Sequence, residues 1–295
     1  MTLRRLIPLI LLLTLAALLA ACAPPSANST PTSPTQAPAA QPQKEAPAPS
    51  PTPPAASPAP ADIDVSPAGV SLDDQGLVES WQAVLVPATL YDNMHPPGPT
   101  GLPTHIQILF NGVSVPKERE PGAPVIYIIP AAAYAQLWQE HDSRAVADQL
   151  RMIKAYSRKL PEPKPVRGLP ALPVEETFGI NDFATQLRQA PDKNGFRFVG
   201  RFAMDATPLT NEGLRYIYQG FTPDGRYLVA FFFPVRTDAL PDGLEAIPQA
   251  DADAFQADGL GWPAKKSAEL DALPGDAWEP DLTKLDALIA SLSIK

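Results

Sequence analysis

Hydrophobic positions alternate most clearly in the second half of the chain. Three segments there are rich in aromatic and β-branched residues: 195–205, 213–221 and 226–236. In the middle segment Leu214, Tyr216 and Tyr218 stand two positions apart, which is the spacing of a half-buried strand. Residues 222–225 (Thr-Pro-Asp-Gly) predict a turn, because proline presets φ and glycine accepts a positive φ. With 182–190 as a further strand, the pattern predicts an antiparallel meander.

Strands and helices are also expected earlier in the chain. The expected strands are 81–86, 105–110, 113–115 and 125–129. Asn111-Gly112 joins the second of them to the third, and this dipeptide is the strongest short hairpin signal. Apolar residues recurring at three and four positions predict three helices: 131–140, from Asp142 or Ser143 to Arg158, and from Pro280 to Leu292. Residues 160–173 hold five prolines and are expected to cross the surface as an extended connection.

These elements predict an α+β domain over residues 62–295, with a mainly antiparallel sheet and helices packed on its face. The meander and its closing helix resemble the PsbP-like sandwich in the C-terminal part of the chain. The same region is similar to domains of uncharacterised bacterial lipoproteins that end with a tyrosine-rich strand, the residues Asp224-Gly225-Arg226-Tyr227 and an aromatic strand. Neither resemblance implies a catalytic residue.

Residues 1–21 have the parts of a secretory signal peptide. Two arginines precede an apolar run that is too short for a settled membrane span. At its end, Leu19-Ala20-Ala21-Cys22 resembles the lipobox of bacterial lipoproteins. That resemblance implies that signal peptidase recognises Leu19, Ala20 and Ala21, that the chain is cut after Ala21, and that Cys22 is acylated. The alternatives are a plain secretory signal that leaves Cys22 as a free thiol, or an uncleaved signal anchor.

Residues 22–61 are expected to be a lipidated cysteine followed by a disordered tether. The segment 23–61 contains 13 of the 38 prolines of the chain, and Lys44 and Glu45 are its only charged residues. Such a composition cannot bury enough apolar surface to fold, and it favours polyproline II. At about 3.1 Å per residue the tether would span roughly 120 Å when fully extended. It would hold the domain away from the lipid.

Charge and cysteine content exclude several classes of function. Residues 62–295 contain 20 basic and 31 acidic residues, a net charge of −11, which argues against nucleic acid as a partner. Cys22 is the only cysteine, so once acylated it leaves no thiol for a disulfide, thiol catalysis or a thiolate metal site. The sequence predicts no cofactor and no metal.

No assembled catalytic motif is present in the sequence. The motifs G-x-S-x-G and H-E-x-x-H and the glycine-rich phosphate loops are all missing. His95, beside Asp92 in a loop rich in proline and glycine, is a candidate metal ligand or general base, although a plain surface histidine is the simpler interpretation. His141 is expected at a helix end, where a cation suits the helix dipole.

Acidic pairs and clusters are interpreted as solvated surface. Asp73-Asp74 and Glu175-Glu176 would serve glycoside hydrolysis only if a cleft held two carboxylates at a set separation. The segment 251–258 faintly resembles a calcium loop, but Phe255 occupies a ligand position. The aromatic residues of the expected strands are assigned to the core rather than to a ligand surface.

Together these features predict a lipid-anchored extracytoplasmic protein of the bacterial cell membrane. The bilayer is its partner through acylated Cys22, and an envelope protein or a small ligand is a further partner. The domain is expected to be a non-enzymatic binding or interaction module. The alternative is an envelope hydrolase that acts on glycan or ester with dispersed carboxylates.

Replacing Cys22 with serine is expected to move the protein from the membrane fraction to the soluble fraction, because two or three acyl chains provide the anchoring. Fractionation followed by a carbonate wash measures this. Retention of the Cys22→Ser chain at the wild-type level would contradict the lipid anchor.

Overall fold

The computed structural model describes residues 64–94, 98–111, 122–177, 179–191, 194–259 and 261–295. The expected signal peptide, Cys22, the tether, His95 and the segment 113–115 lie outside the described residues. The strands are β1 (Val70–Ser71), β2 (Trp81–Val86), β3 (His105–Phe110), β4 (Val125–Pro130), β5 (Ile180–Gln189), β6 (Gly195–Ala203), β7 (Arg215–Phe221), β8 (Tyr227–Pro234) and β9 (Ser293–Ile294). The helices are α2 (Ala131–Gln139), α3 (Ala145–Arg158), α4 (Gln249–Ala257), α5 (Gly261–Asp271) and α6 (Leu282–Ser291).

Within the described residues, seven strands form one antiparallel sheet in the order β2-β3-β4-β8-β7-β6-β5. The expected meander is confirmed as β5 to β8, and β4 joins it to the earlier strands through β8. The short strands β1 and β9 pair separately, with Val70 opposite Ile294. None of the helices in these parts of the chain is long and apolar enough to cross a bilayer.

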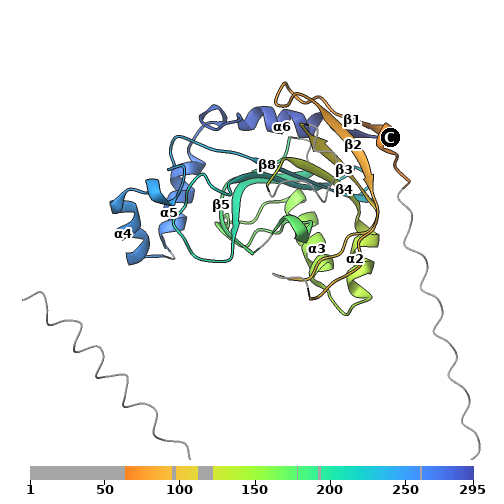
Figure 1. The fold of residues 1–295 in the computed structure, drawn as a ribbon, viewed down its shortest axis with the longest axis horizontal. Coiled ribbons are helices and arrows are strands. Elements are labelled where there is room, and N and C mark those ends of the chain that lie inside the picture. Colours follow the sequence, from red (N-terminus) through yellow and green to blue (C-terminus); the bar gives the residue numbers. More distant parts are fainter. Residues whose placement is uncertain (1–63, 95–97, 112–121, 178, 192–193, 260) are drawn as a thin grey trace, which may run out of the picture. The chain divides into compact units, whose positions relative to one another are not determined.

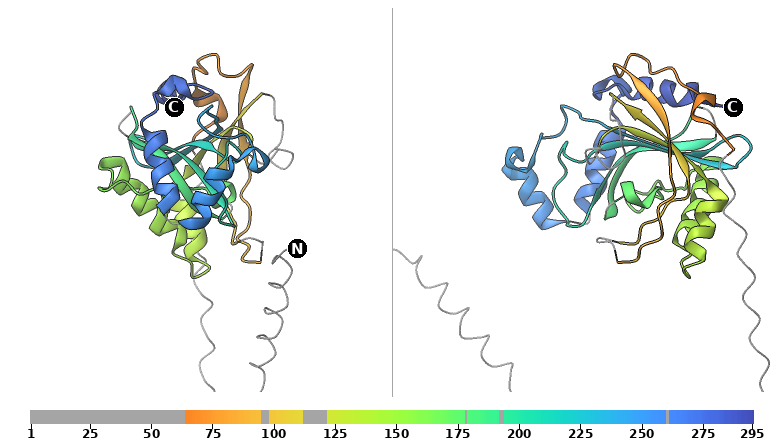
Figure 2. Two further views of the ribbon diagram at one scale, coloured as in Figure 1. Left: turned by 90° about the vertical axis from the view of Figure 1, so that its left-hand side faces the viewer. Right: turned by 45° about the vertical axis from the view of Figure 1, so that its right-hand side comes forward.

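Helices cover both faces of the sheet, α6 on one and α2 with α3 on the other, while α5 lies along β5 (Figures 1 and 2). Successive residues of the central strands therefore enter two different cores. Tyr216 and Phe231 pack with α6, whereas Ile217 and Phe232 belong to the core under α2 and α3. The α+β class is confirmed, but the prediction of half-buried strands in the second half of the chain was wrong: β7 is buried at every position except its two ends, and β6 is buried from Gly195 to Arg201.

The sequence located most of the regular elements. Strands β2 and β3 have the expected bounds. Both ends of the other long strands and of α2 lie within two residues of the expected ones. Strand β5 begins two residues earlier than expected, and β7 begins two residues later. Helix α3 begins at Ala145 rather than directly after Asp142 or Ser143, since Asp142 takes a positive φ of 58°. Asp281 caps α6 by accepting a hydrogen bond from the Thr283 amide. The pattern did not reveal α4, α5 or the β1–β9 pair.

The proline-rich connection 160–173 does not cross the surface along its whole length, contrary to the expectation from its sequence. Its last five residues, Leu169–Pro173, are buried. Their backbone groups are satisfied by side chains from the domain. Gln219, fully buried in β7, accepts from the Leu172 amide at 3.0 Å and donates to the Leu172 carbonyl at 2.9 Å. A polar residue in a buried strand thus lets an irregular segment enter the core.

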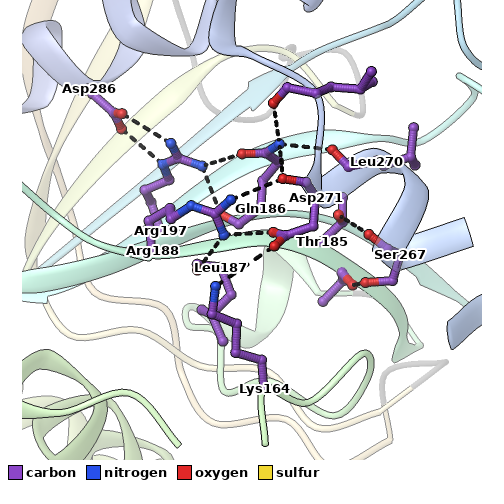
Figure 3. Close-up of polar contacts among 12 residues, drawn as sticks. Lys164, Thr185, Gln186, Leu187, Arg188, Arg197, Ser267, Leu270, Asp271 and Asp286 are labelled. Atoms are coloured by element: carbon purple, nitrogen blue, oxygen red, sulfur yellow. Dashed lines mark hydrogen bonds and ion pairs between the residues drawn. The ribbon is translucent and has the colours of Figure 1, made fainter. Parts of the chain in front are cut away.

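A bulge in β5 fastens α5 to the edge of the sheet (Figure 3). Gln186 has a positive φ of 53° there, and its amide donates to the carbonyls of Leu270 at 2.8 Å and Leu273 at 2.9 Å. Beside it, Thr185 donates to the Ser267 carbonyl at 2.8 Å. The bulge therefore directs side chains of β5 toward the end of α5. A regular strand ladder would not form these bonds, because it pairs a strand with another strand and not with the end of a helix.

An ion pair between β6 and α6 holds the closing helix on the sheet (Figure 3). Asp286 accepts from Arg197 Nε at 3.1 Å and Nη2 at 3.2 Å, and from the Tyr216 hydroxyl at 2.8 Å. The side chains of Arg197 and Asp286 are only 10% and 18% exposed. Burial raises the pKa of Tyr216 well above its usual value, so this hydroxyl stays a donor.

Replacing Asp286 with alanine is expected to lower the free energy of unfolding by about 2–4 kcal/mol, because Arg197 would remain largely buried without its carboxylate. Urea denaturation measures the loss. Asp242→Ala is the matched control, since Asp242 pairs with Arg236 at the exposed surface and should cost less than about 1 kcal/mol. Equal losses in the two variants would show that the buried pair has no special role.

Candidate ligand pocket

A pocket of about 550 Å³ lies beside the turn between β7 and β8. Its walls come from four parts of the chain: Asp64 and Val65, Asn194 before β6, the hairpin of β7 and β8 with its turn, and residues between Ile289 and Lys295 at the end of α6 and in β9. Its volume is within the range of sites that hold small ligands. The pocket thus forms where the chain enters the domain.

Apolar side chains of the core form the floor of this pocket. Val65, Tyr218, Val229 and Ile289 line it, and each is at least nine-tenths buried. Tyr218 and Val229 lie on neighbouring strands whose side chains face α6. The floor is therefore a place where the core beneath α6 reaches the surface.

A charged group lies at the rim. Asp64 accepts from Arg226 Nη2 at 2.6 Å and from the Tyr227 hydroxyl. These two hydrogen bonds, that of Tyr227 first, lower the pKa of Asp64, and burial together with the bond to Asp64 raises the pKa of Tyr227. Asp64 is therefore an anion at neutral pH, and its hydrogen bonds hold this part of the chain against the start of β8.

The turn beside the pocket has the geometry expected from its sequence. The Gly225 amide donates to the Thr222 carbonyl at 2.8 Å, and Gly225 has a φ of 73°. The Thr222 hydroxyl bonds to Asp224 at 2.5 Å, which lowers the pKa of that carboxyl. An apolar floor with an ionised rim suits a ligand that has an apolar body and a polar end.

A buried polar cluster lies on the opposite side of the sheet. Glu176 accepts from the Tyr127 hydroxyl at 2.6 Å and from Arg215 Nη1 at 2.9 Å. The side chain of Glu176 is 4% exposed, so the expectation that Glu175-Glu176 is solvated was wrong. Glu175 accepts from the Gly101 amide at 2.8 Å. These acids hold loops onto the sheet, and burial lowers the pKa of Arg215.

His105 is buried next to this cluster. Its Nδ1 lies 2.8 Å from the Pro103 carbonyl and its Nε2 lies 3.1 Å from the amide nitrogen of Gln107. The neutral ring fits both contacts when Nδ1 donates and Nε2 accepts. Burial lowers the pKa of His105 to about 4. The ring stacks on Tyr127 with its centroid 5.7 Å away.

The structure separates the other sequence candidates. His141 follows the end of α2, as expected, and stacks on Tyr91 at 4.4 Å. Asp73 and Asp74 accept backbone amides in an exposed turn. The segment 251–258 is mostly helix α4, where Asp251 pairs with Lys266 at 3.5 Å. No group of metal-ligating side chains is found in the described part of the chain.

The sequence indicated part of the pocket but not the contribution of Asp64 to its rim. The sequence predicts a turn at 222–225 followed by a strand, which places Tyr227 at the start of β8 and Arg226 one residue before it. Nothing in the sequence linked them to Asp64, which is 162 residues away from Arg226. No family model, curated protein or solved structure matches this chain at a significant level.

Stability is expected to fall as the pH drops from 6.5 to about 4, because the fold keeps His105 neutral whereas the unfolded chain binds a proton below pH 6.5. His105 makes its full contribution to the free energy of unfolding above pH 6.5, and on the order of 3 kcal/mol of that contribution is lost by pH 4. Denaturation at several pH values measures it, together with an NMR titration of the ring.

His105→Gln should flatten the pH dependence within that window, whereas His141→Gln, at an exposed position, should leave it unchanged. An unaltered slope in His105→Gln would show that other groups cause the acid sensitivity.

Proposed function

We propose that this chain is a lipid-anchored extracytoplasmic binding protein. Acylated Cys22 holds it on the membrane, residues 23–61 act as a spacer, and the domain captures a ligand in the pocket at Asp64. The lipobox-like residues 19–22 support the anchor, and the composition of 23–61 supports the spacer. The ligand is a small molecule or part of an envelope protein.

The pocket itself is the observation that carries the binding role. It combines a buried apolar floor with the ionised rim of Asp64, Asp224 and Arg226. Asp64 and Arg226 form an ion pair, so the three groups together keep the single negative charge of Asp224. The apolar floor would provide most of the affinity, and the rim would orient the ligand.

The rim supports binding rather than hydrolysis. A glycosidase that uses two acids must keep one of them protonated at neutral pH, which requires a raised pKa. In this pocket hydrogen bonds lower the pKa of both Asp64 and Asp224, so both are ionised. Asp64 and Asp224 therefore do not provide the protonated carboxyl that a hydrolase needs. The negative charge of the domain also argues against nucleic acid as a ligand.

Ligand binding is tested by thermal shift of the detergent-extracted chain against a panel of fatty acids, sugars and short peptides. A bound ligand raises the melting temperature, since ligand at 100 times its dissociation constant adds about 2.7 kcal/mol. Ala290→Trp is expected to abolish that shift, because Ala290 is exposed and lines the pocket, so a bulky side chain there blocks it without disturbing the core.

The matched control is Ala132→Trp, at an exposed helical alanine outside the pocket. It should keep the full shift. A ligand whose shift survives Ala290→Trp binds elsewhere, and turnover of an ester or glycan probe by the wild-type chain but not by Ala290→Trp would favour the hydrolase.

A further inference from the structure

The two edges of the main sheet differ in how they are protected. Natural edge strands carry bulges, charges, proline or a covering element, because their open backbone groups would otherwise pair with another chain. Strand β5 has register irregularities at two places and contains Asp182 and Arg188. Helix α5 also lies along it. This edge is closed to further strands.

Strand β2 lacks the bulges, charges and proline that protect an edge, although the short turn Pro67–Gly69 lies close to it. Its sequence Trp-Gln-Ala-Val-Leu-Val contains no charge, proline or glycine, and it pairs with β3 in unbroken register. It lies at the margin of the sheet (Figure 1). Every residue of β2 is at least partly exposed, and Leu85 is 51% exposed, whereas all of β3 is buried.

The hydrogen-bond phase shows which groups of β2 point outward. The Asn111 amide donates to the Ser80 carbonyl at 2.9 Å, so residues 80, 82, 84 and 86 direct their backbone groups toward β3. Trp81, Ala83 and Leu85 therefore direct their N–H and C=O groups away from the sheet. Across the described segments no backbone hydrogen bond reaches these three residues from that side.

We propose that β2 pairs antiparallel with β2 of a second copy of this chain, so that two sheets become continuous. The outward residues are self-complementary about Ala83. Trp81 of one copy faces Leu85 of the other, and the two Ala83 residues meet on the twofold axis. Each of these pairs would exchange two backbone hydrogen bonds.

Charge and composition favour a second copy as the occupant. In this register Glu79 faces Pro87, so no like charges are opposed along the strand in spite of the acidic domain. The tether is a poor occupant, because its prolines lack the N–H groups that a strand must donate. This inference goes beyond the proposed ligand site and depends on membrane anchoring only for the raised local concentration of copies.

Disulfide crosslinking in membranes from cells that produce the full chain tests the pairing. With Cys22 acylated, Ala83→Cys provides a single free thiol on the twofold axis, where paired Cα atoms lie about 5.5 Å apart, within disulfide range. Mild oxidation should give a band at twice the monomer mass, which reductant removes. The wild-type chain should give none.

Two controls make the result specific. Gln82→Cys should crosslink poorly, because Gln82 faces Val84 of the second copy rather than its own equivalent. In the Ala83→Cys background, Leu85→Lys should remove the band and Leu244→Lys, at another exposed leucine, should keep it. Unchanged melting temperatures confirm that each variant is folded.

Three results would overturn the proposal. They are the absence of a dimer band from Ala83→Cys, an equal band from Gln82→Cys, and a band that survives Leu85→Lys. The first, obtained with a normal melting temperature, would show that β2 does not pair with β2 of a second copy.

Discussion

Burial of both faces of one antiparallel sheet is the constraint on which the rest of the structure depends. Strands β3, β4, β7 and β8 have no solvent-facing side, so each of their side chains must fit into one of two cores. Polar residues in these strands need fixed partners, because an unpaired buried donor or acceptor is costly. Gln219 finds its partner in the connection 160–173, and Tyr216 finds its partner in α6. The buried polar groups thus determine which outer segments can cover the sheet.

The expected meander and the turn at 222–225 could be predicted because both depend on local sequence. Alternation of aromatic residues marks the strands, and proline with glycine marks the turn. The alternation of apolar positions does not show whether helices also cover the second face of the sheet. Phe232 lies between the two aromatic neighbours Phe231 and Phe233, and the three side chains enter opposite cores. Such a continuous aromatic run is typical of a strand buried on both faces.

Other parts of the fold depend on contacts between distant residues. Helix α4 contains no buried residue, so it has no apolar stripe to recognise. In α5 the helix buries only Trp262, Ser267 and Leu270, and its attachment depends on side chains of the β5 bulge. The pocket has the same origin. Its turn is local and was predicted, whereas Asp64 reaches it only because β1 and β9 bring the first described residues next to the end of α6.

The pairing of β1 with β9 has a mechanical consequence. A pull transmitted through the residues before Asp64 would load the Asp64–Arg226 ion pair and this two-residue pairing before it loads the main sheet. These attachments are short and lie outside the seven-stranded ladder, so they can yield while the ladder stays intact. This part of the chain would then act as a release point: Val65 and Val70 would leave the core beneath α6, whereas the main sheet and the core under α2 and α3 would stay intact.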